Sequence, residues 1–493
     1  MFKIIKHNIV IILILITAAG LLSININKKF IGIHDWNGVW YGTIAKNNLK
    51  LGLLHTKLGS VKGTGDTQLS AGSYFTHYPV LFPLILTAGY YLMGVSEASL
   101  RITVSAFSLL SVLFIYLITK RIFDKKTAIY SAIFTIITPL FIYYGKMPVH
   151  EPVLLCLVLG TVYFYIKWFD SQKNKDFLGM SVFLVISLLI TWPAYFVPFL
   201  LLCHYYLFHK QKKHLKLLLL LILIEISAFL LHLLHVYILT GSFFGGGLIE
   251  IFLSRISSDS TTQLYSLNIT KYLTTEIRYF SLYFTRILLF FSGVWFFTQI
   301  YYILRFKKIS YKNSIIWLFM IFGSLYLVIF KEASFLHDYL IYYLLPFFVI
   351  SSAIIFIKLI NFITNKYLKY IVIVLAIVII GSDKYSYLVA LIKSNQSEKA
   401  YTIGNFINNN ASANDKVFIA SNVYRQFYGP FITYYSNYSI INYAESLDLT
   451  TAKKYNLIVR IKSHDALDPN SKIILATNFK PNEDDNFIYY FPQ

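Results

Sequence analysis

Cysteine is nearly absent from this sequence, with two residues, Cys156 and Cys203, among 493, and both fall inside apolar runs. A disulfide framework and a thiolate zinc site are therefore not expected. The sequence also has no internal repeat and no low-complexity segment, which excludes solenoid and tract-like architectures.

Acidic residues are also scarce. Asp and Glu together number 23 against 44 Lys and Arg, so the formal net charge is +21. The basic residues stand in short blocks between apolar runs, which is the pattern of topology signals in a membrane protein and not of a nucleic-acid-binding surface. With 57% hydrophobic residues and a mean hydropathy of +0.60, the chain is predicted to be a multi-pass α-helical membrane protein without a nucleic-acid partner.

The apolar runs are close to the length of about 20 residues that a helix needs to cross a bilayer. We predict eleven spans, near residues 8–24, 99–118, 127–144, 152–168, 177–190, 194–208, 216–239, 280–304, 314–330, 339–357 and 370–388. The first is interpreted as an uncleaved span and not as a signal peptide, because the segment directly after it carries the first chemical motif.

The loops between these spans alternate in charge. Three or four Lys or Arg occur in each of TKRIFDKK, KWFDSQKNKD, KQKKHLK, RFKKISYKN and KLINFITNKYLK. The loops GKMPVHEP, TWPA and KEASFLHD hold one, none and one. By the positive-inside rule the N-terminus is cytosolic, and the weakly charged loops and the C-terminus lie outside. The predicted location is the plasma membrane.

Two long outer loops follow from this topology, at residues 25–97 and 241–279. Residues 79–94 are apolar, but a crossing there would invert every later loop, so they are interpreted as an interfacial or re-entrant helix. The stretch after the glycines of GSFFGGG is predicted to be another interfacial helix. The membrane domain is thus assigned to residues 1–390. A small extracytoplasmic α/β domain is assigned to 391–493, with a helix in SEKAYTIGNFINNN and strands in KVFIAS and NLIVRI.

Asp35 is the first candidate for chemistry. It lies in HDWNGVWY, shortly after the first span and beside Trp36 and Trp40. Aromatic neighbours at the lipid–water boundary desolvate a carboxylate and raise its basicity, so that it can take a proton from an acceptor. A solvated loop aspartate beside interfacial aromatics is the structural alternative.

His150 and Glu151 form the second candidate, at the outer end of a span and between two prolines. The pair suits a divalent metal or a phosphate-linked substrate. An acidic residue that favours a helix N-terminus is the alternative interpretation.

Further candidates lie in the other outer loops. Lys331, His337 and Asp338 belong to KEASFLHDY, where a cation can neutralise a leaving phosphate. His77 begins the interfacial helix, and Arg101 opens the second span, where an interfacial anchor is equally expected.

One span carries the ionisable residues Glu225, His232 and His235. Ionisable groups within a membrane often mark a proton path, which would suit a transporter. Only this span shows such a set, so helix packing is the favoured role. Trp192 and Pro193 are interpreted as a turn.

Taken in order, these motifs resemble the C-type membrane glycosyltransferases, in particular the dolichyl-phosphate-mannose protein mannosyltransferase and aminoarabinose-transferase-like superfamily. The resemblance covers roughly residues 1–345 and includes Asp35 with Tyr41 and IAKN, then HYPVLFPLIL, the His150–Glu151 pair and HDYLIYYLLP. Two departures are His34 before Asp35, where many members have an Asp-Glu pair, and the single acid of the second motif.

The resemblance implies transfer of a sugar from a polyprenyl-phosphate carrier to an extracytoplasmic lipid, glycan or protein acceptor. It implies that Asp35 is the general base, with inversion at the anomeric carbon, and that the second motif holds the carrier phosphate or a divalent cation. The candidates are catalytic Asp35 and Glu151, and substrate-binding His34, Tyr41, His77, Arg101, His150, Lys331, His337 and Asp338. No metal ligand is assigned. A transporter or flippase of a lipid-linked substrate and a non-catalytic scaffold are the alternatives.

Overall fold

The computed structural model describes residues 2–63, 69–209, 214–256, 268–412, 415–420, 428–436, 440–444, 454–461, 479–483 and 487–492. The chain divides into two compact units. The membrane unit comprises residues 1–26, 76–85 and 98–392, and the second unit comprises residues 27–75, 86–97 and 393–493. Much of the predicted outer loop 25–97 therefore groups with the C-terminal residues.

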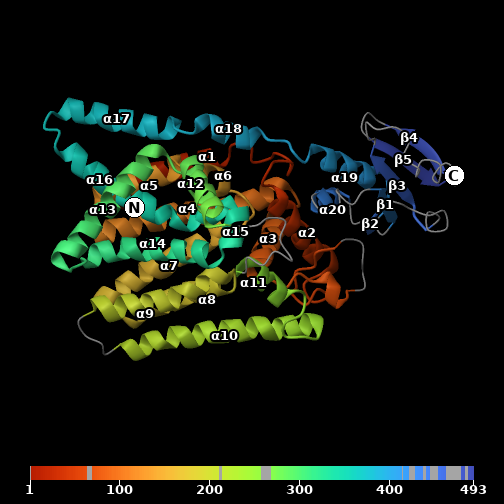
Figure 1. The fold of residues 1–493 in the computed structure, drawn as a ribbon, viewed down its shortest axis with the longest axis horizontal. Helices are drawn as coiled ribbons and strands as arrows, with labels where there is room; N and C mark the ends of the chain where they lie inside the picture. The colour runs from red at the N-terminus through yellow and green to blue at the C-terminus, as the bar shows by residue number, and fades with distance from the viewer. Residues whose placement is uncertain are drawn as a thin grey trace. The chain divides into compact units, whose positions relative to one another are not determined.

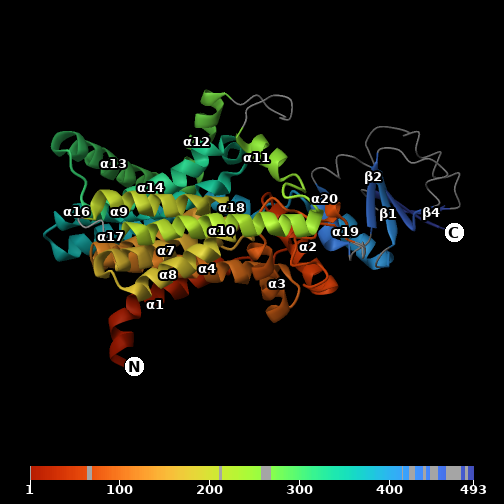
Figure 2. The same cartoon turned by 90° about the horizontal axis from the view of Figure 1, so that it is seen from below.

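The membrane unit is built from helices (Figure 1). Their bounds are α1 Phe2–Leu22, α4 Glu97–Ile122, α5 Lys125–Ile137, α6 Pro139–Tyr144, α7 His150–Ser171, α8 Asn174–Leu188, α9 Val197–Phe208, α10 Leu215–Thr240, α11 Leu248–Ile256, α12 Ile269–Tyr283, α13 Arg286–Phe306, α14 Tyr311–Ile329, α15 Lys331–Leu336, α16 Leu345–Asn361, α17 Lys366–Ser382 and α18 Tyr385–Lys393. Two 3-10 helices, η2 Trp192–Phe196 and η3 Asp338–Leu344, lead into α9 and α16. Figures 1 and 2 both show α7, α8, α9 and α10 running side by side.

Seven helical stretches among the described residues are long and apolar enough to cross a membrane. They begin at Glu97, His150, Leu215, Arg286, Tyr311, Asp338 and Lys366. Shorter apolar helices cover Asn8–Leu22, Leu81–Met93 and Trp192–Phe208. The predicted multi-pass helical architecture is present, and the number of spans stays a prediction.

Three predicted spans are each divided between two α-helices, and the one at 370–388 is divided between α17, which ends at Ser382, and α18, which begins at Tyr385. The other two are divided at capping residues. Residues 127–144 form α5 and α6, because Pro139 cannot continue α5 and Thr138 caps the next helix by accepting from the Phe141 amide. The span predicted at 280–304 begins in the last turn of α12, which ends at Tyr283, and α13 starts at Arg286. Thr285 caps α13 in the same way, so both interruptions follow from local capping signals.

Helices α7 and α8 pack through small residues that face large ones. A Cβ atom on Gly160 would lie 2.3 Å from the Phe183 ring, and one on Gly179 would lie 2.6 Å from the Phe164 ring. Each glycine thus makes room for an aromatic ring of the other helix, which is how helix backbones approach closely within membranes. This packing keeps α7 almost wholly buried, so that its N-terminal residues are held in a fixed position.

Helix α10 carries the ionisable residues of the predicted seventh span. His232 is buried, and its ring centroid lies 5.3 Å from that of Trp192 in η2. The Trp192 indole donates a hydrogen bond of 3.0 Å to the carbonyl oxygen of His77. These contacts give His232 a packing role, and Trp192 anchors the segment that carries His77.

The apolar residues 79–94 form α3, Leu81–Met93, which has 13 residues. At 1.5 Å per residue its length is about 20 Å, against about 30 Å for a hydrocarbon core. The predicted helix after GSFFGGG is present as α11. Part of the block KQKKHLK and the middle of the predicted loop 241–279 lie outside the described residues.

The second unit combines helices with a mixed sheet (Figure 1). Its elements are α2 Trp36–Leu51, η1 Ala71–Ser73, the later part of α3, α19 Glu398–Asn410, α20 Gly429–Tyr435, β1 Lys416–Ala420, β2 Ile440–Ala444, β3 Leu457–Ile461, β4 Phe479–Glu483 and β5 Phe487–Pro492. The strand order is β2-β1-β3-β5-β4. The first three strands are parallel, and β5 pairs antiparallel with β3 and β4.

The predicted C-terminal helix and two strands appear as α19, β1 and β3. Consecutive residues such as Val417, Phe418 and Ile419 of β1 are all buried, as expected for a central strand covered on both faces. Ile403 and Ile407 of α19 are buried one turn apart, so this helix presents a continuous apolar stripe. The domain boundary at residue 390 stays a prediction.

Candidate active site

Asp35 occupies the N-cap position of α2, yet its side chain makes no capping bond. Its backbone is in the αR region (φ −74°, ψ 0°), whereas a capping residue is usually extended. Its Oδ2 atom instead accepts a bond of 2.7 Å from the amide of Gly32, and the side chain is buried. A Cβ atom on Gly32 would lie 2.9 Å from that oxygen, so glycine allows this approach.

The residues around Asp35 divide into exposed and buried groups. Trp36 is exposed and stacks on Trp40 with ring centroids 5.0 Å apart, which agrees with the expected aromatic neighbourhood. Tyr41 is buried within α2, and His34 is half-buried. Within this unit Asp35, His34 and Tyr41 thus stand within two turns of chain at the start of one helix.

In the membrane unit, His150 and Glu151 are both buried in the first turn of α7. The His150 ring packs against Tyr78 and Phe82, with centroids 4.5 and 4.3 Å away. The His77 ring in turn contacts Tyr78 at 4.4 Å. The structure thus brings the segments of the two predicted histidines, 73 residues apart in the sequence, together through Tyr78. Glu151 lies in the first turn of α7, where an acidic residue is favourable, as the alternative interpretation of this residue requires.

Arg101 is buried, and its guanidinium donates a bond of 2.9 Å to the carbonyl oxygen of Ile26. Lys146, which the sequence analysis did not single out, is also buried and donates to the carbonyl oxygen of Ile24. Both cations therefore bind backbone carbonyl groups in the segment that follows α1. Lys146 stands in GKMPVHEP beside the predicted His150–Glu151 pair, and that proximity was the only sequence signal for it.

Asp338 is the acceptor of a buried tyrosine cluster. Tyr144 in α6 donates to Oδ1 at 2.5 Å, and Tyr283 in α12 donates to Oδ2. The two hydroxyls lie 3.1 Å apart, and Tyr387 donates to that of Tyr283 at 3.3 Å. Asp338 was predicted from the sequence but none of these tyrosines was, because nothing local in the sequence distinguishes them from the other 37.

The remaining predicted residues of this loop are less enclosed. Lys331 begins α15 and is half-buried, as is His337. The His337 ring stacks on Tyr339, with centroids 5.2 Å apart and an interplanar angle of 25°. Lys331 and His337 are grouped with Asp338 by their adjacency in the chain.

Glu276 of α12 is a buried carboxyl near this cluster. Burial raises its pKa to about 7 from 4.5, and the charge of Asp338 adds to the shift. The folded state therefore binds this proton more tightly than the unfolded chain does.

Replacing Glu276 with glutamine is expected to flatten the dependence of the melting temperature on pH. The raised pKa stabilises the folded state in full below pH 4.5, and this contribution is lost as the pH rises through about 7. The wild-type melting temperature should fall over that window, and that of Glu276→Gln should fall less. Glu250→Gln, at an exposed acid of α11, is the control. Parallel curves for wild type and Glu276→Gln would contradict the assignment.

An apolar cavity of about 340 Å³ lies in the membrane unit. Aromatic side chains from several helices line it, among them Trp192, Phe229 and Phe252, and His77 contributes the polar group. Its volume is within the range of about 300–1,000 Å³ found for ligand pockets. A flexible hydrocarbon group is the ligand that such walls accept.

Metal binding finds little support in the geometry. Across the described residues, no group of three or more His, Cys, Asp or Glu side chains gathers to hold an ion. The His150 ring is packed between aromatic rings, which leaves it poorly placed as one of several ligands.

Comparison with known proteins gives one family and several solved structures. Residues 77–235 match the model of the dolichyl-phosphate-mannose-protein mannosyltransferase family, a segment that contains His77, Arg101, His150 and Glu151. No curated protein matches the sequence.

The solved structures share the fold at low sequence identity. ArnT from Cupriavidus metallidurans bound to undecaprenyl phosphate has a TM-score of 0.65 at 11% identity, and the match covers 97% of each chain. The apo oligosaccharyltransferase of Archaeoglobus fulgidus has a TM-score of 0.60 at 13% identity, covering 93% of this chain and 70% of that one. A further structure of the archaeal enzyme AglB holds an inhibitory peptide and a dolichol-phosphate, with a TM-score of 0.57 at 12% identity.

Proposed function

From the premise that this chain has the C-type membrane glycosyltransferase fold, we propose that it transfers a sugar from a polyprenyl-phosphate carrier to an extracytoplasmic acceptor. The observation that carries the proposal is a buried aspartate that starts a helix without capping it, in a chain of this fold. Its carboxylate is turned back toward Gly32, so the helix does not use it.

The carrier lipid is supported by two features. ArnT, which shares the fold, is solved with undecaprenyl phosphate, and AglB is solved with a dolichol-phosphate. The apolar cavity of the membrane unit has walls suited to isoprenoid units, with His77 as its polar group. The lipid is proposed to enter sideways between helices and to present its phosphate at the outer surface.

Asp35 is proposed as the general base that deprotonates the incoming nucleophile. The nucleophile then displaces the carrier phosphate at the anomeric carbon, so one bond forms as the other breaks and the configuration inverts. The leaving group is a phosphate anion, which requires cations: Arg101, Lys331 and His337 are proposed to offset its charge. His77, His150 and Glu151 are proposed to orient the carrier, and His34 and Tyr41 to shape the acceptor side.

Asp338 is proposed as a positioning residue. Both of its oxygens accept bonds from tyrosine hydroxyls, so it joins α6, α12 and η3.

The proposed acceptor of the sugar is a lipid, a glycan or a protein. The peptide-bound oligosaccharyltransferase structures favour none of these for this chain, because they show only a shared fold. The loop charges support an orientation in which the C-terminal unit lies outside the cytosol. The membrane is proposed to be the plasma membrane.

A panel of radiolabelled polyprenyl-phosphate sugars in liposomes containing the full-length protein tests this function. Release of free polyprenyl phosphate with at least one donor, dependent on the protein, is the expected result. Movement of the intact lipid between leaflets without any release would instead identify a flippase. Failure of every donor to react or move would contradict both functions.

A further inference from the structure

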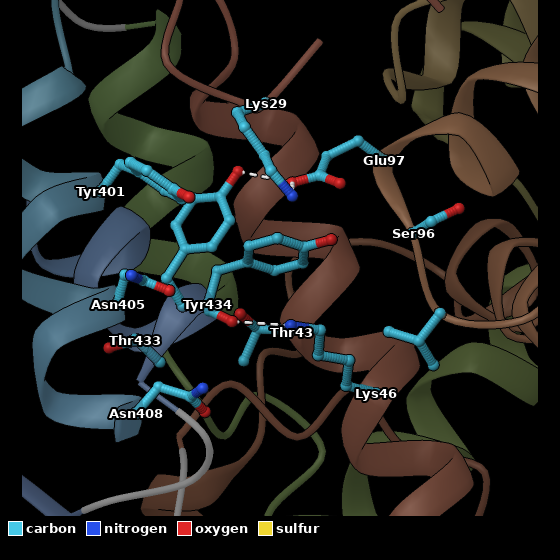
Figure 3. A pocket seen from close by; sticks show the side chains of 12 residues that line it. Lys29, Thr43, Lys46, Ser96, Glu97, Tyr401, Asn405, Asn408, Thr433 and Tyr434 are labelled. Atoms are coloured by element: carbon cyan, nitrogen blue, oxygen red, sulfur yellow. Dashed lines mark hydrogen bonds and ion pairs between the residues drawn. The ribbon is translucent and has the colours of Figure 1, made fainter. Parts of the chain in front are cut away.

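A polar cavity of about 390 Å³ lies wholly within the second unit (Figure 3). Its walls come from the segment before α2, from α2, from residues 95–97 at the start of α4, and from α19 and α20. Lys46 of α2 is one of its lining residues and stands 11 residues after Asp35. At 1.5 Å per residue the two side chains are separated by about 16 Å along one rigid helix.

The charges in this cavity are compensated locally. The Lys46 ammonium lies 3.6 Å from the centroid of the Tyr434 ring and donates a bond of 2.6 Å to the Tyr434 carbonyl oxygen. Burial lowers the pKa of Lys46 to about 8, with Glu97 opposing the shift and Lys29 adding to it. The Lys46 ammonium is thus held by the ring and the carbonyl oxygen of Tyr434, and the charge of Glu97 acts against that of the two lysines.

The second cation of the cavity is paired as well. Lys29 lies 3.6 Å from Oε1 of Glu97, and the same oxygen accepts a bond of 2.7 Å from the Tyr435 hydroxyl. Figure 3 shows Lys29 and Glu97 pointing toward each other at one side of the cavity. The cavity thus combines polar walls with two lysines and one glutamate, each of which is engaged by other groups of the protein.

The opposite wall offers unused hydrogen-bonding groups. Asn405 and Asn408 are three residues apart on α19, so both side chains lie on one face. Both are exposed, and in the part of the chain that the structure describes neither amide has a protein partner. Each amide presents a donor and an acceptor together. Figure 3 shows both on the same side of the cavity as Tyr401.

Aromatic rings complete the site. Tyr401 packs edge to face on Tyr435, with centroids 4.7 Å apart and an interplanar angle of 87°. Tyr434 packs in the same manner on Tyr435, and its hydroxyl is bonded to that of Tyr90 at 2.9 Å. The rings are therefore locked before any ligand arrives. A rigid ring beside paired amides matches a sugar, which has C–H faces and closely spaced hydroxyls.

We propose that this cavity binds a neutral saccharide unit of the acceptor. The inference rests on the proposed function, because it names the acceptor as a glycan or glycolipid headgroup. Asn405 and Asn408 donate to and accept from the sugar hydroxyls, and Tyr401 packs against the ring. Because α2 carries both Asp35 and Lys46, it fixes the distance between the reacting base and the bound unit.

Saturation-transfer NMR on the full-length protein in nanodiscs tests the proposal without requiring turnover. The probes are neutral disaccharides of glucose, galactose and N-acetylglucosamine, with hydrophilic Ser/Thr peptides as the competing class. Ring-proton signals from at least one disaccharide are expected in wild type. The double variant Asn405→Ala/Asn408→Ala is expected to bind it roughly 30-fold more weakly, since two hydrogen bonds are lost.

Asn409→Ala is the matched control, because this exposed asparagine lies on the same helix and does not line the cavity. It should bind as wild type does. No disaccharide signal, equal binding by the double variant, or variant-sensitive binding of the peptides alone would overturn the proposal. Donor cleavage by the liposome assay is measured separately, so a failed saccharide site and a failed transferase are distinguishable.

Discussion

Replacing Asp35 with asparagine is expected to lower the rate of sugar transfer by about 10²–10⁴-fold, the range that a positioned general base contributes. Asparagine has nearly the same shape, and its carbonyl oxygen can still accept the bond from the Gly32 amide. The variant should therefore fold as wild type does. Transfer from the active donor in liposomes is the measurement, with the melting temperature recorded beside it.

Asp124→Asn is the matched control for this substitution. Asp124 is also an N-cap aspartate, but its side chain caps α5 by accepting from the amides of Lys126 and Thr127. Asparagine caps a helix about as well as aspartate, so this variant should keep near wild-type stability and a near wild-type rate of transfer. Near-normal transfer by Asp35→Asn would refute the role of Asp35 as the base while leaving the transferase in place.

Replacing Asp338 with leucine is expected to destabilise the membrane unit by about 3 kcal/mol or more. The carboxylate accepts from the hydroxyls of Tyr144 and Tyr283 in a buried setting, and its removal leaves both donors without that acceptor. Each buried polar group left unsatisfied costs about 1–3 kcal/mol. A fall of about 5 °C or more in melting temperature, measured in detergent, is the expected readout.

Asp170→Leu is the control that separates the loss of a buried acceptor from the loss of an exposed aspartate. Asp170 pairs with Arg121 at 2.8 Å, but both side chains are more than a third exposed, and surface pairs contribute only about 0–1 kcal/mol. A double-mutant cycle of Asp338→Asn with Tyr283→Phe should give a coupling energy above about 1 kcal/mol. Equal melting temperatures for the two leucine variants, or additive effects in the cycle, would show that the cluster does not hold the loop.

The positions of the helices were largely predictable from the sequence. A helix covers or overlaps every predicted apolar segment, because burial in lipid demands length and hydrophobicity, and both are local properties. The breaks at Pro139, before Arg286 and before Tyr385 were missed. Proline and capping threonine residues are visible in the sequence, but the hydrophobic run continues across them and hides the interruption.

Part of the candidate site was also predictable. Asp35 and the His150–Glu151 pair stand out because acids are rare in this chain and lie beside apolar segments. Lys146 and the tyrosines around Asp338 did not stand out. A buried cation is indistinguishable in the sequence from a loop cation, and 40 tyrosines offer no reason to select Tyr144 or Tyr283.

The sequence alone thus determined the membrane class, the approximate helices, the resemblance to C-type glycosyltransferases and the acid proposed as the base. Each depends on residues that are neighbours in the chain. Tertiary structure decided which distant residues meet. It turned Asp35 toward Gly32 instead of its own helix, and it gathered Tyr144, Tyr283 and Asp338. It also formed the polar cavity of the second unit from three separate parts of the chain. Such meetings depend on how helices and strands pack, because hydrophobic burial does not specify which polar side chains become neighbours.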